Sequence, residues 1–318
     1  MQRNVPMPLI SLTGIRVVFT SVTNRIHAVD TVDLSLDPGD RLALIGESGC
    51  GKTVLGMAVM GLLPKNAEFN GIIRYDDLNL SSLSARGMQE IRGREIAMIS
   101  QNSVNALNPV MTVGEQIAEP LIFHKILTRN AAHDEASRLL RQMEFDEPDK
   151  ARGHYPHEFS GGMRERILIA MALSCNPRLL IADEPTAGLD ARIKLHVLEV
   201  IKKQLSCRRT LLLITHDLGT ASFLCNRIAV MYAGEIVETG LLHDVLTVPM
   251  HPYTQGLIAS HPSAGLHPIP GMSPPPDQLP EGCRFFPRCS SATDLCRKTH
   301  PLLINTSGSR QVRCFHYD

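Results

Sequence analysis

The chain has 318 residues, of which 43% are hydrophobic and 20% are charged, a composition typical of a globular protein with a sizeable core. Its 32 Lys and Arg residues balance its 32 Asp and Glu residues, so no strong net field favours nucleic acid as the main ligand. No uncharged apolar run reaches the roughly 18 residues of a membrane-spanning helix, and the first 14 residues lack the apolar segment of a signal peptide. We therefore expect a cytosolic protein.

The first elements along the chain are predicted strands. In residues 31–36, Val32, Leu34 and Leu36 alternate with polar residues, which is typical of a half-buried antiparallel strand. Continuous apolar runs are typical of strands covered on both faces of a parallel sheet, and they occupy residues 41–45, 95–100, 178–182 and 210–214. Apolar residues from Ile193 to Leu205 recur at helical spacing. The core is therefore predicted to be an α/β sheet with an antiparallel addition at its N-terminal edge.

Two stretches depart from this alternation of strand and helix. Residues from about 102 to 170 have helical patterns without an intervening strand, which predicts a helical subdomain. After about residue 245 the chain becomes dense in proline, which excludes a long helix or a central strand and indicates an extended connector into a small terminal module. We therefore divide the chain into a domain of residues 1–244 and an extension of residues 245–318.

The first motif, "GESGCGKT" at residues 46–53, follows a predicted strand and precedes a predicted helix, as a P-loop does. In such a loop the backbone amides and the helix N-terminus face phosphates. Lys52 is then expected to reach the β- and γ-phosphates and the Thr53 hydroxyl to contact Mg²⁺. The alternative is a glycine turn that caps a helix, but the order of strand, motif and helix favours a nucleotide. The predicted nucleotide-binding residues here are Gly46, Glu47, Ser48, Gly49, Cys50, Gly51, Lys52 and Thr53.

Two further groups could act on a bound nucleotide. Asp183 and Glu184 end a buried apolar run, where Asp183 would hold Mg²⁺ and Glu184 would polarise the water that attacks the γ-phosphate. Without the P-loop they could equally be solvated loop residues or helix caps. Ser160, Gly161 and Gly162 precede a helix and offer amides and a hydroxyl to an anion, although they would also suit a capped helix start.

The order of these motifs resembles that of ABC-type ATPases. The segment "FSGGM" at residues 159–163 resembles their signature motif, in the variant of peptide importers. Gln101 resembles the Q-loop residue, Asp190 in "AGLD" the D-loop residue, and His216 the switch histidine. Any of these three alone would more often be structural, but their joint order supports the family. The resemblance covers residues 8–318 and implies a P-loop NTPase fold, with residues 1–244 as the ABC ATPase domain.

This resemblance implies an ATP site shared between two subunits that meet head to tail. The chain would supply the P-loop side of one site and, through Ser160, Gly161 and Gly162, the signature side of the other. The catalytic residues would be Glu184, His216 and Gln101, the Mg²⁺ ligands would be Thr53, Gln101 and Asp183, and Asp190 would also contribute to nucleotide binding. Phe19 would stack on adenine, although core packing explains that residue equally well.

The C-terminal extension resembles that of the oligopeptide, dipeptide and nickel import ATPases, and more specifically that of their D-type subunit. The segments that carry this likeness are "HPYTQGLIAS" at 251–260 and "GCRFFPRC" at 282–289. Four cysteines match the pattern by which some of these subunits hold an iron–sulfur cluster, and four thiolates suit a 4Fe–4S centre. Zinc is the second possibility, although no C-x-x-C pair is present, and free thiols are the third. The four residues are Cys283, Cys289, Cys296 and Cys314.

The sequence departs from the usual family pattern at three positions. Cys50 stands in the P-loop where serine is common, Glu165 where glutamine often follows the signature, and Gly188 where alanine is frequent in the D-loop. Because backbone amides hold the phosphates, Cys50 is expected to change affinity little, although it could make nucleotide binding sensitive to thiol modification. The other cysteines outside the tail, Cys175, Cys207 and Cys225, are scattered.

The expected function is to bind and hydrolyse ATP for an importer of peptides or a related small solute such as nickel or a metal chelate. The implied partners are two permease subunits, a second ATPase similar to the F-type subunit and an extracytoplasmic solute-binding protein, with this chain at the cytoplasmic face of the membrane. One alternative is a soluble ABC ATPase that acts on DNA or ribosomes, which the zero net charge and the single cassette disfavour. Another is a redox-sensing regulator whose purpose lies in the tail cysteines.

Overall fold

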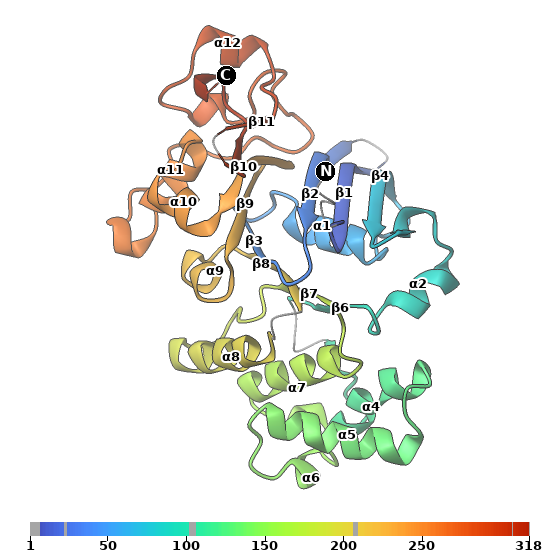
Figure 1. Ribbon diagram of the computed structural model, residues 1–318. Helices are drawn as coiled ribbons and strands as arrows, with labels where there is room; N and C mark the ends of the chain where they lie inside the picture. Colours follow the sequence, from blue (N-terminus) through green and yellow to red (C-terminus); the bar gives the residue numbers. More distant parts are fainter. Residues whose placement is uncertain (1–6, 22–23, 102–105, 206–208, 307, 318) are drawn as a thin grey trace, which may run out of the picture. The chain divides into compact units, whose positions relative to one another are not determined.

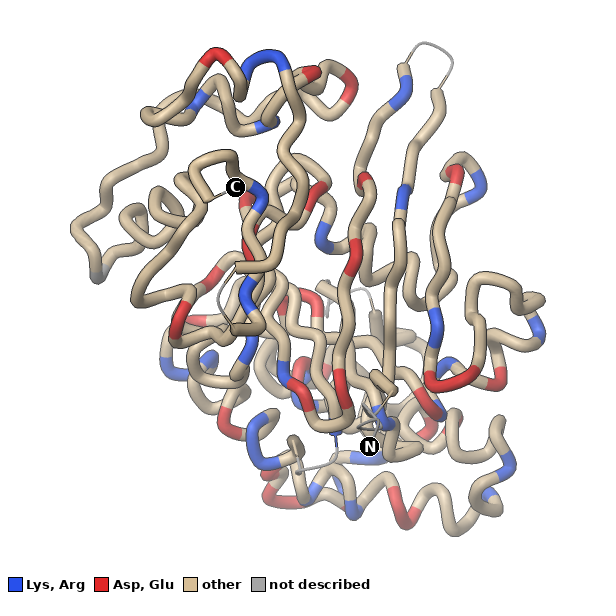
Figure 2. Tube along the Cα trace, turned by 45° about the horizontal axis from the view of Figure 1, so that its top comes forward, with Lys and Arg blue, Asp and Glu red and all other residues tan. Residues whose placement is uncertain are grey.

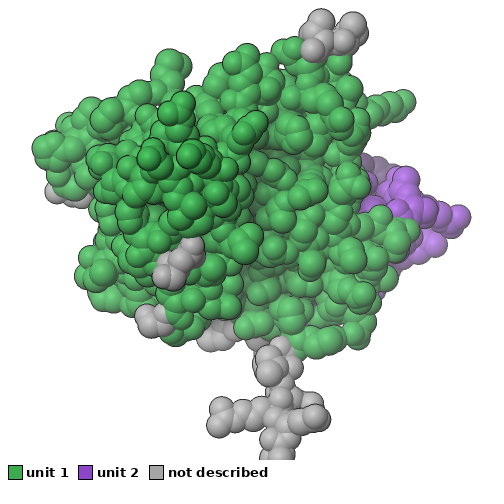
Figure 3. Space-filling view, turned by 90° about the horizontal axis from the view of Figure 1, so that it is seen from above, with its two compact units in different colours: residues 1–82, 213–318 green, residues 83–212 purple. Residues whose placement is uncertain are grey.

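The computed structural model describes residues 7–21, 24–101, 106–205, 209–306 and 308–317. The chain divides into two compact units, which are coloured separately in Figure 3, while Figure 1 labels the helices and strands. Unit 1 comprises Met1–Ser82 and Leu213–Asp318, and unit 2 comprises Leu83–Leu212. The strand β8 (Thr210–Thr215) passes from unit 2 into unit 1. Unit 1 therefore joins the N-terminal strands to the whole C-terminal extension.

Unit 1 contains the predicted antiparallel addition as a four-stranded sheet. Its strands, in the spatial order β2-β1-β4-β5, are β2 (Arg25–Leu36), β1 (Ile10–Thr20), β4 (Ala67–Tyr75) and β5 (Leu78–Asn79). All neighbours are antiparallel, and Val17 lies opposite both Val29 and Phe69. The alternation around residues 31–36 appears within β2, where Val32, Leu34 and Leu36 are buried. The antiparallel prediction is confirmed.

A second group of strands in unit 1 carries the loop of residues 46–53. The strand β3 (Arg41–Ile45) pairs in parallel with β9 (Arg227–Tyr232), and β10 (Glu235–Leu241) pairs antiparallel to β9. The extension adds β12 (Gln311–Val312) and β11 (Ile304–Asn305), which follow β10 in antiparallel order. The tail therefore extends the core sheet, which the sequence did not predict. The α-helices of unit 1 are α1 (Lys52–Val59), α9 (Leu218–Leu224), α10 (Leu242–Thr247), α11 (Pro252–Ala259) and α12 (Asp294–Lys298).

An aromatic cluster joins the extension to this sheet. Tyr232 of β9 packs on Tyr253 of α11 with 4.5 Å between ring centroids, and on Phe285 of the tail with 5.3 Å. All three side chains are nearly or fully buried. Because buried aromatic rings contribute large apolar areas, this cluster is a substantial part of the contact between tail and core.

The described part of unit 2 contains two complete strands and a set of helices. The strands β6 (Ile96–Ile99) and β7 (Leu179–Asp183) are parallel, as their continuous apolar runs predicted, with Met98 opposite Ile181. The helices are α2 (Ala85–Ile91), α4 (Val113–Phe123), α5 (Arg129–Gln142), α6 (Pro148–Ala151), α7 (Gly161–Leu173) and α8 (Ala191–Gln204). Between β6 and β7 the described residues form helices and no strand, in agreement with the helical stretch predicted there.

Two acidic side chains are buried on β10 and are neutralised by the extension. Glu238 is fully buried and accepts a hydrogen bond from Arg310 Nε at 3.2 Å. Glu235, which is 3% exposed, lies 2.9 Å from His300 Nε2 and 3.2 Å from Arg284 Nε. Because a buried carboxylate is costly without a cation or hydrogen-bond donors, these contacts explain why the tail folds onto the sheet.

No helix among the described residues is long and apolar enough to cross a membrane. Figure 2 shows that basic and acidic residues are both spread along the described chain and do not gather in separate segments. The distribution of charge thus agrees with the balanced composition.

The contact between His300 and Glu235 predicts a pH-dependent stability. The hydrogen bond to Glu235 raises the pKa of His300 despite partial burial. A raised folded-state pKa gives a contribution that is fully present below the ordinary value of about 6.5 and is lost as the pH rises through the folded value. We therefore expect His300→Gln to lower the free energy of unfolding by about 1 kcal/mol at acidic pH and by less in alkaline solution. Urea unfolding of parent and variant across this pH range measures the difference, and a pH-independent difference contradicts the assignment.

Candidate active site

The loop of residues 46–53 connects β3 to α1 and lies tightly against its neighbours. A Cβ atom at Gly46 would stand 2.1 Å from the carbonyl oxygen of Met231, and one at Gly51 would stand 2.1 Å from that of Ala28. Gly51 also has a φ of 106°, in the left-handed region. Only glycine fits at either position without a backbone shift, so the glycine pattern of the motif follows from close packing on β2 and β9.

Lys52 crosses this loop. Its Nζ donates to the carbonyl oxygens of Gly46 at 2.8 Å and Glu47 at 2.9 Å, and the side chain is buried. The first turn of α1 contains no acidic residue, so the positive end of the helix is not offset, and Thr53 lies half-buried in that turn. A buried ammonium beside a helix N-terminus is an arrangement that attracts phosphate.

Cys50 is less accessible than its position in the loop suggested. The residue is 6% exposed, and burial raises the pKa of its thiol, although Lys52 opposes this change. Its Sγ lies 3.6 Å from Lys52 Nζ. A covered and protonated thiol is a poor nucleophile, which opposes the thiol sensitivity considered from the sequence.

The extension contacts the P-loop at Glu47, which the sequence did not predict. The Glu47 amide donates to the Tyr253 hydroxyl at 2.9 Å, and its carboxylate accepts hydrogen bonds from Arg288 at 2.9 and 3.0 Å. Ser273 donates to the same carboxylate. Although burial acts to raise the pKa of Glu47, the hydrogen bonds from Arg288 and Ser273 outweigh it and hold that pKa below its ordinary value. No motif in the sequence indicates that Arg288 or Ser273 would contact Glu47.

Two other predicted residues lie in unit 1. His216 follows β8 and is exposed, one residue before Asp217, which caps α9 by accepting from the Gly219 amide at 2.8 Å. Phe19 is half-buried near the end of β1, opposite Ile26 of β2. Its roles as an adenine platform and as a packing residue both remain predictions.

The predicted Mg²⁺ ligands of unit 2 lie at one edge of a strand pair. Ile99 of β6 is opposite Ala182 of β7, so Gln101 and Asp183 stand at the carboxyl ends of neighbouring parallel strands. Asp183 is 1% exposed and Gln101 is exposed. Glu184 follows directly with a φ of 48°, a left-handed conformation that is uncommon outside glycine and is often found at functional sites.

The signature segment and the D-loop residue both begin helices of unit 2. Ser160 caps α7 by accepting from the Met163 amide at 3.4 Å, and Asp190 caps α8 by accepting from the amides of Arg192 and Ile193 at 3.1 Å. Both residues therefore act as helix caps, which is the structural alternative to a nucleotide contact. Their contacts with a nucleotide remain predictions. A Cβ atom at Gly162 would lie 2.4 Å from Ile193 Cγ2, so that glycine lets α7 approach α8.

The four tail cysteines, Cys283, Cys289, Cys296 and Cys314, line one small cavity of the extension. Cys296 and Cys314 are buried, and burial raises the pKa of Cys283 to about 11. No disulfide joins the described cysteines, and Cys207 lies outside the described residues. Within the described ranges no group of three or more His, Cys, Asp or Glu side chains is arranged to hold a single metal ion.

Comparisons with known proteins agree with this geometry. A family model described as "ABC transporter" matches residues 29–187, and one described as "Oligopeptide/dipeptide transporter, C-terminal region" matches residues 237–296. The oligopeptide transport ATP-binding protein AppD of Bacillus subtilis is 43% identical, over 98% of this chain and 97% of its own. The corresponding protein OppD of Salmonella typhimurium is 38% identical, over 96% of this chain and 93% of its own.

The chain belongs to the oligopeptide/dipeptide family of ABC transporter ATPases. A solved dimeric structure of the ATP-binding cassette MJ0796 bound to ADP and phosphate has a TM-score of 0.65 and 27% identity, and the match covers 73% of this chain and 98% of that one. The predicted ABC ATPase fold and the predicted ATP hydrolysis that powers transport are thereby confirmed. The comparisons give no support to the redox-regulatory alternative.

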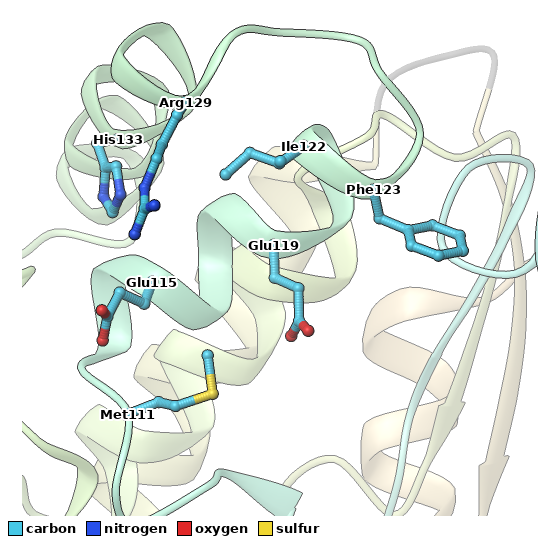
Figure 4. A pocket seen from close by; sticks show the side chains of 7 residues that line it. All are labelled: Met111, Glu115, Glu119, Ile122, Phe123, Arg129 and His133. Atoms are coloured by element: carbon cyan, nitrogen blue, oxygen red, sulfur yellow. The ribbon is translucent and has the colours of Figure 1, made fainter.

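This ABC ATPase also has an amphipathic pocket on the helices of unit 2, which Figure 4 shows. Glu115, Glu119, Ile122 and Phe123 come from α4, while Arg129 and His133 extend from α5 and Met111 lies just before α4. The pocket has a volume of about 370 Å³, and the Phe123 side chain is 58% exposed. An exposed aromatic ring beside charged groups is typical of a protein interface.

Burial of Cys50 predicts slow modification of the P-loop. We expect iodoacetamide to alkylate Cys50 at least about tenfold more slowly in the folded protein than in the urea-unfolded chain, because the thiol is covered and its pKa is raised. Mass spectrometry of the peptide that contains Cys50 measures the rate, and half-buried Cys175 in unit 2 serves as the internal comparison. Equal rates in the folded and unfolded chain would show that the loop opens freely.

Proposed function

We propose that the chain is the ATP-hydrolysing subunit of an importer for peptides or a related small solute such as nickel or a metal chelate. The observation that carries this proposal is the P-loop, in which Lys52 crosses a glycine-shaped loop at the start of α1. Support for the solute class comes from relatives aligned over nearly the whole chain, which include the dipeptide transport ATP-binding protein DppD of Bacillus subtilis at 41% identity.

We assign the chemical roles as follows. The P-loop amides and Lys52 hold the β- and γ-phosphates, and Thr53, Asp183 and Gln101 are the proposed ligands of Mg²⁺, which would offset phosphate charge when bound. Glu184 orients and polarises the attacking water, and His216 contacts the γ-phosphate. The fit of a hard cation rests on the donor set, since carboxylate, amide and hydroxyl oxygens are the ligands that Mg²⁺ prefers.

The second half of each ATP site is proposed to come from another subunit. Ser160, Gly161, Gly162 and Asp190 would face the nucleotide held by that partner. The exposure of Ser160 and Asp190 at two helix starts supports this assignment, as does the dimeric state named for the related cassette. We propose an F-type ATPase as the partner, so that the two subunits form a heterodimer.

The amphipathic pocket on α4 and α5 is the proposed docking surface for the membrane permeases. Exposed Ile122 and Phe123 offer apolar contacts, while Glu115, Arg129 and His133 offer polar contacts at the rim. An amphipathic helix placed in an apolar groove is a recurrent mode of recognition. This arrangement would hold the chain at the cytoplasmic face of the membrane, with two permeases and an extracytoplasmic solute-binding protein completing the importer.

The four tail cysteines are proposed to hold a 4Fe–4S cluster. The four thiols line one cavity and would supply the four thiolates that such a cluster needs. Structural zinc sites usually contain closely spaced cysteine pairs, whereas the tail cysteines are separated by five, six and seventeen residues.

Glu184 tests the catalytic assignment. Glu184→Gln is expected to lower ATP hydrolysis by at least about 100-fold, because the amide cannot act as a base, while MgATP binding is retained. Steady-state hydrolysis and equilibrium binding of a fluorescent ATP analogue measure the two effects. Glu199→Gln, an exposed acid on α8, is the matched control and should keep the parental rate. A Glu184→Gln protein that turns over like the parent would remove Glu184 from its role.

Anaerobic purification tests the cluster. The parent is expected to show broad visible absorbance from thiolate-to-iron charge transfer and about four iron atoms per chain. Cys289→Ser should lose most of both, whereas Cys175→Ser should lose neither. Stoichiometric zinc without visible absorbance, or four thiols that titrate freely in the native protein, would contradict the proposal.

A further inference from the structure

One arginine of the extension is placed against the ATP-binding loop. Arg288 donates to Glu47 through both terminal nitrogens, Nη1 to Oε2 at 2.9 Å and Nη2 to Oε1 at 3.0 Å. Its Nε donates to the Pro270 carbonyl at 3.0 Å, and its side chain is 5% exposed. A bidentate, largely buried arginine–carboxylate pair fixes both position and orientation. The contact therefore joins the tail to the P-loop through a defined geometry.

We propose that Arg288 is a positioning residue for nucleotide binding, which holds Glu47 in place and neutralises its charge beside the phosphate-binding loop. The proposal rests on the proposed function only in that the P-loop must bind MgATP. Arg288 is not proposed to touch the nucleotide.

The backbone of Glu47 explains how its position would reach the phosphates. Its amide donates to Tyr253 and its carbonyl accepts from Lys52 Nζ, while its side chain is held by Arg288. Three contacts thus fix one residue of the loop, and one of them is with the lysine that is expected to bind phosphate. A shift of Glu47 would move the carbonyl group that orients Lys52.

The negative charge of Glu47 provides a second way in which Arg288 would affect nucleotide binding. A carboxylate in the loop repels an anionic nucleotide and attracts Lys52 away from it. The paired guanidinium offsets this charge at close range. Without Arg288, Glu47 would be an unpaired anion inside a site that binds polyphosphate.

The segment that carries Arg288 is also linked to the loop indirectly, through residues 233 and 234. Residues 283–289 form a compact turn in which the Phe286 amide donates to the Cys283 carbonyl at 3.0 Å. Arg284 of this turn pairs with Asp30 and donates to the Ala233 carbonyl. The next residue, Gly234, donates its amide to the Cys50 carbonyl at 3.0 Å. The turn between the first two tail cysteines therefore contacts the P-loop directly through Arg288 and supports it indirectly through Arg284.

The test measures MgATP affinity and turnover separately. Arg288→Met is expected to raise the KM and the dissociation constant for MgATP by about tenfold while kcat changes by less than about twofold, since the catalytic groups are untouched. Arg288→Lys keeps the charge and should restore affinity to within about threefold of the parent. If Arg288→Met does not fold, Arg288→Gln takes its place with the same expected loss of affinity, and an unchanged affinity of that variant overturns the proposal.

A double-mutant cycle separates coupling to Glu47 from a general effect. In a Glu47→Gln background, Arg288→Met should change the dissociation constant by less than about threefold, because the charge that it neutralises is gone. Arg310→Gln is the matched control, since Arg310 is a similarly buried arginine of the extension whose partners are Glu238 and the Val248 carbonyl. It should lower thermal stability without changing nucleotide affinity.

Three results would overturn the proposal: unchanged affinity in Arg288→Met, an equal loss in the Glu47→Gln background, or the same loss in Arg310→Gln. Failure of the parent itself to bind MgATP would instead overturn the proposed function, so the two failures are distinguishable. Thermal unfolding of every variant shows whether the folded fraction is sufficient for the binding measurements.

Discussion

Two buried carboxylates of β10 make the core sheet of unit 1 dependent on the C-terminal extension. Glu238 is fully buried and Glu235 nearly so, and leaving such a buried carboxylate without any cationic partner costs about 3–5 kcal/mol. Their cationic partners, Arg284, His300, Arg310 and Arg313, all belong to the extension. The core sheet of unit 1 therefore depends on the tail for charge balance, and the tail in turn is held in one place by those charges.

The charged contacts with β10 hold the extension in place and so fix the positions of its other contacts. The aromatic packing of Tyr232, Tyr253 and Phe285 lies next to the charged contacts and supplies apolar area. From that base, Tyr253 and Arg288 reach Glu47 of the P-loop. A nucleotide-binding loop is usually described by its strand, its glycines and its helix. Here the C-terminal extension, more than 200 residues away in sequence, also takes part in shaping it.

Sequence patterns predicted the structural features that depend on residues close together in the chain. The parallel strands, the antiparallel edge and the helix after Gly51 follow from hydrophobic periodicity and glycine spacing, and they were predicted correctly. Pairing between Glu47 and Arg288 has no such signal, because a contact between distant residues leaves no periodic pattern in either segment. Gly162 shows a different difficulty: an anion-binding loop and close packing on Ile193 both require glycine, so the residue type alone cannot separate them.

The strand order at the tail has a consequence for the protein's behaviour in solution. With β12 and β11 in place, β10 is an interior strand, and the sheet ends in two strands of only two residues each. Short edge strands offer little template for pairing with another chain. Without them, β10 would present unpaired backbone groups together with its buried carboxylates. The extension thus also pairs the edge of β10 and leaves little strand edge open to another chain, a role that does not depend on any ligand.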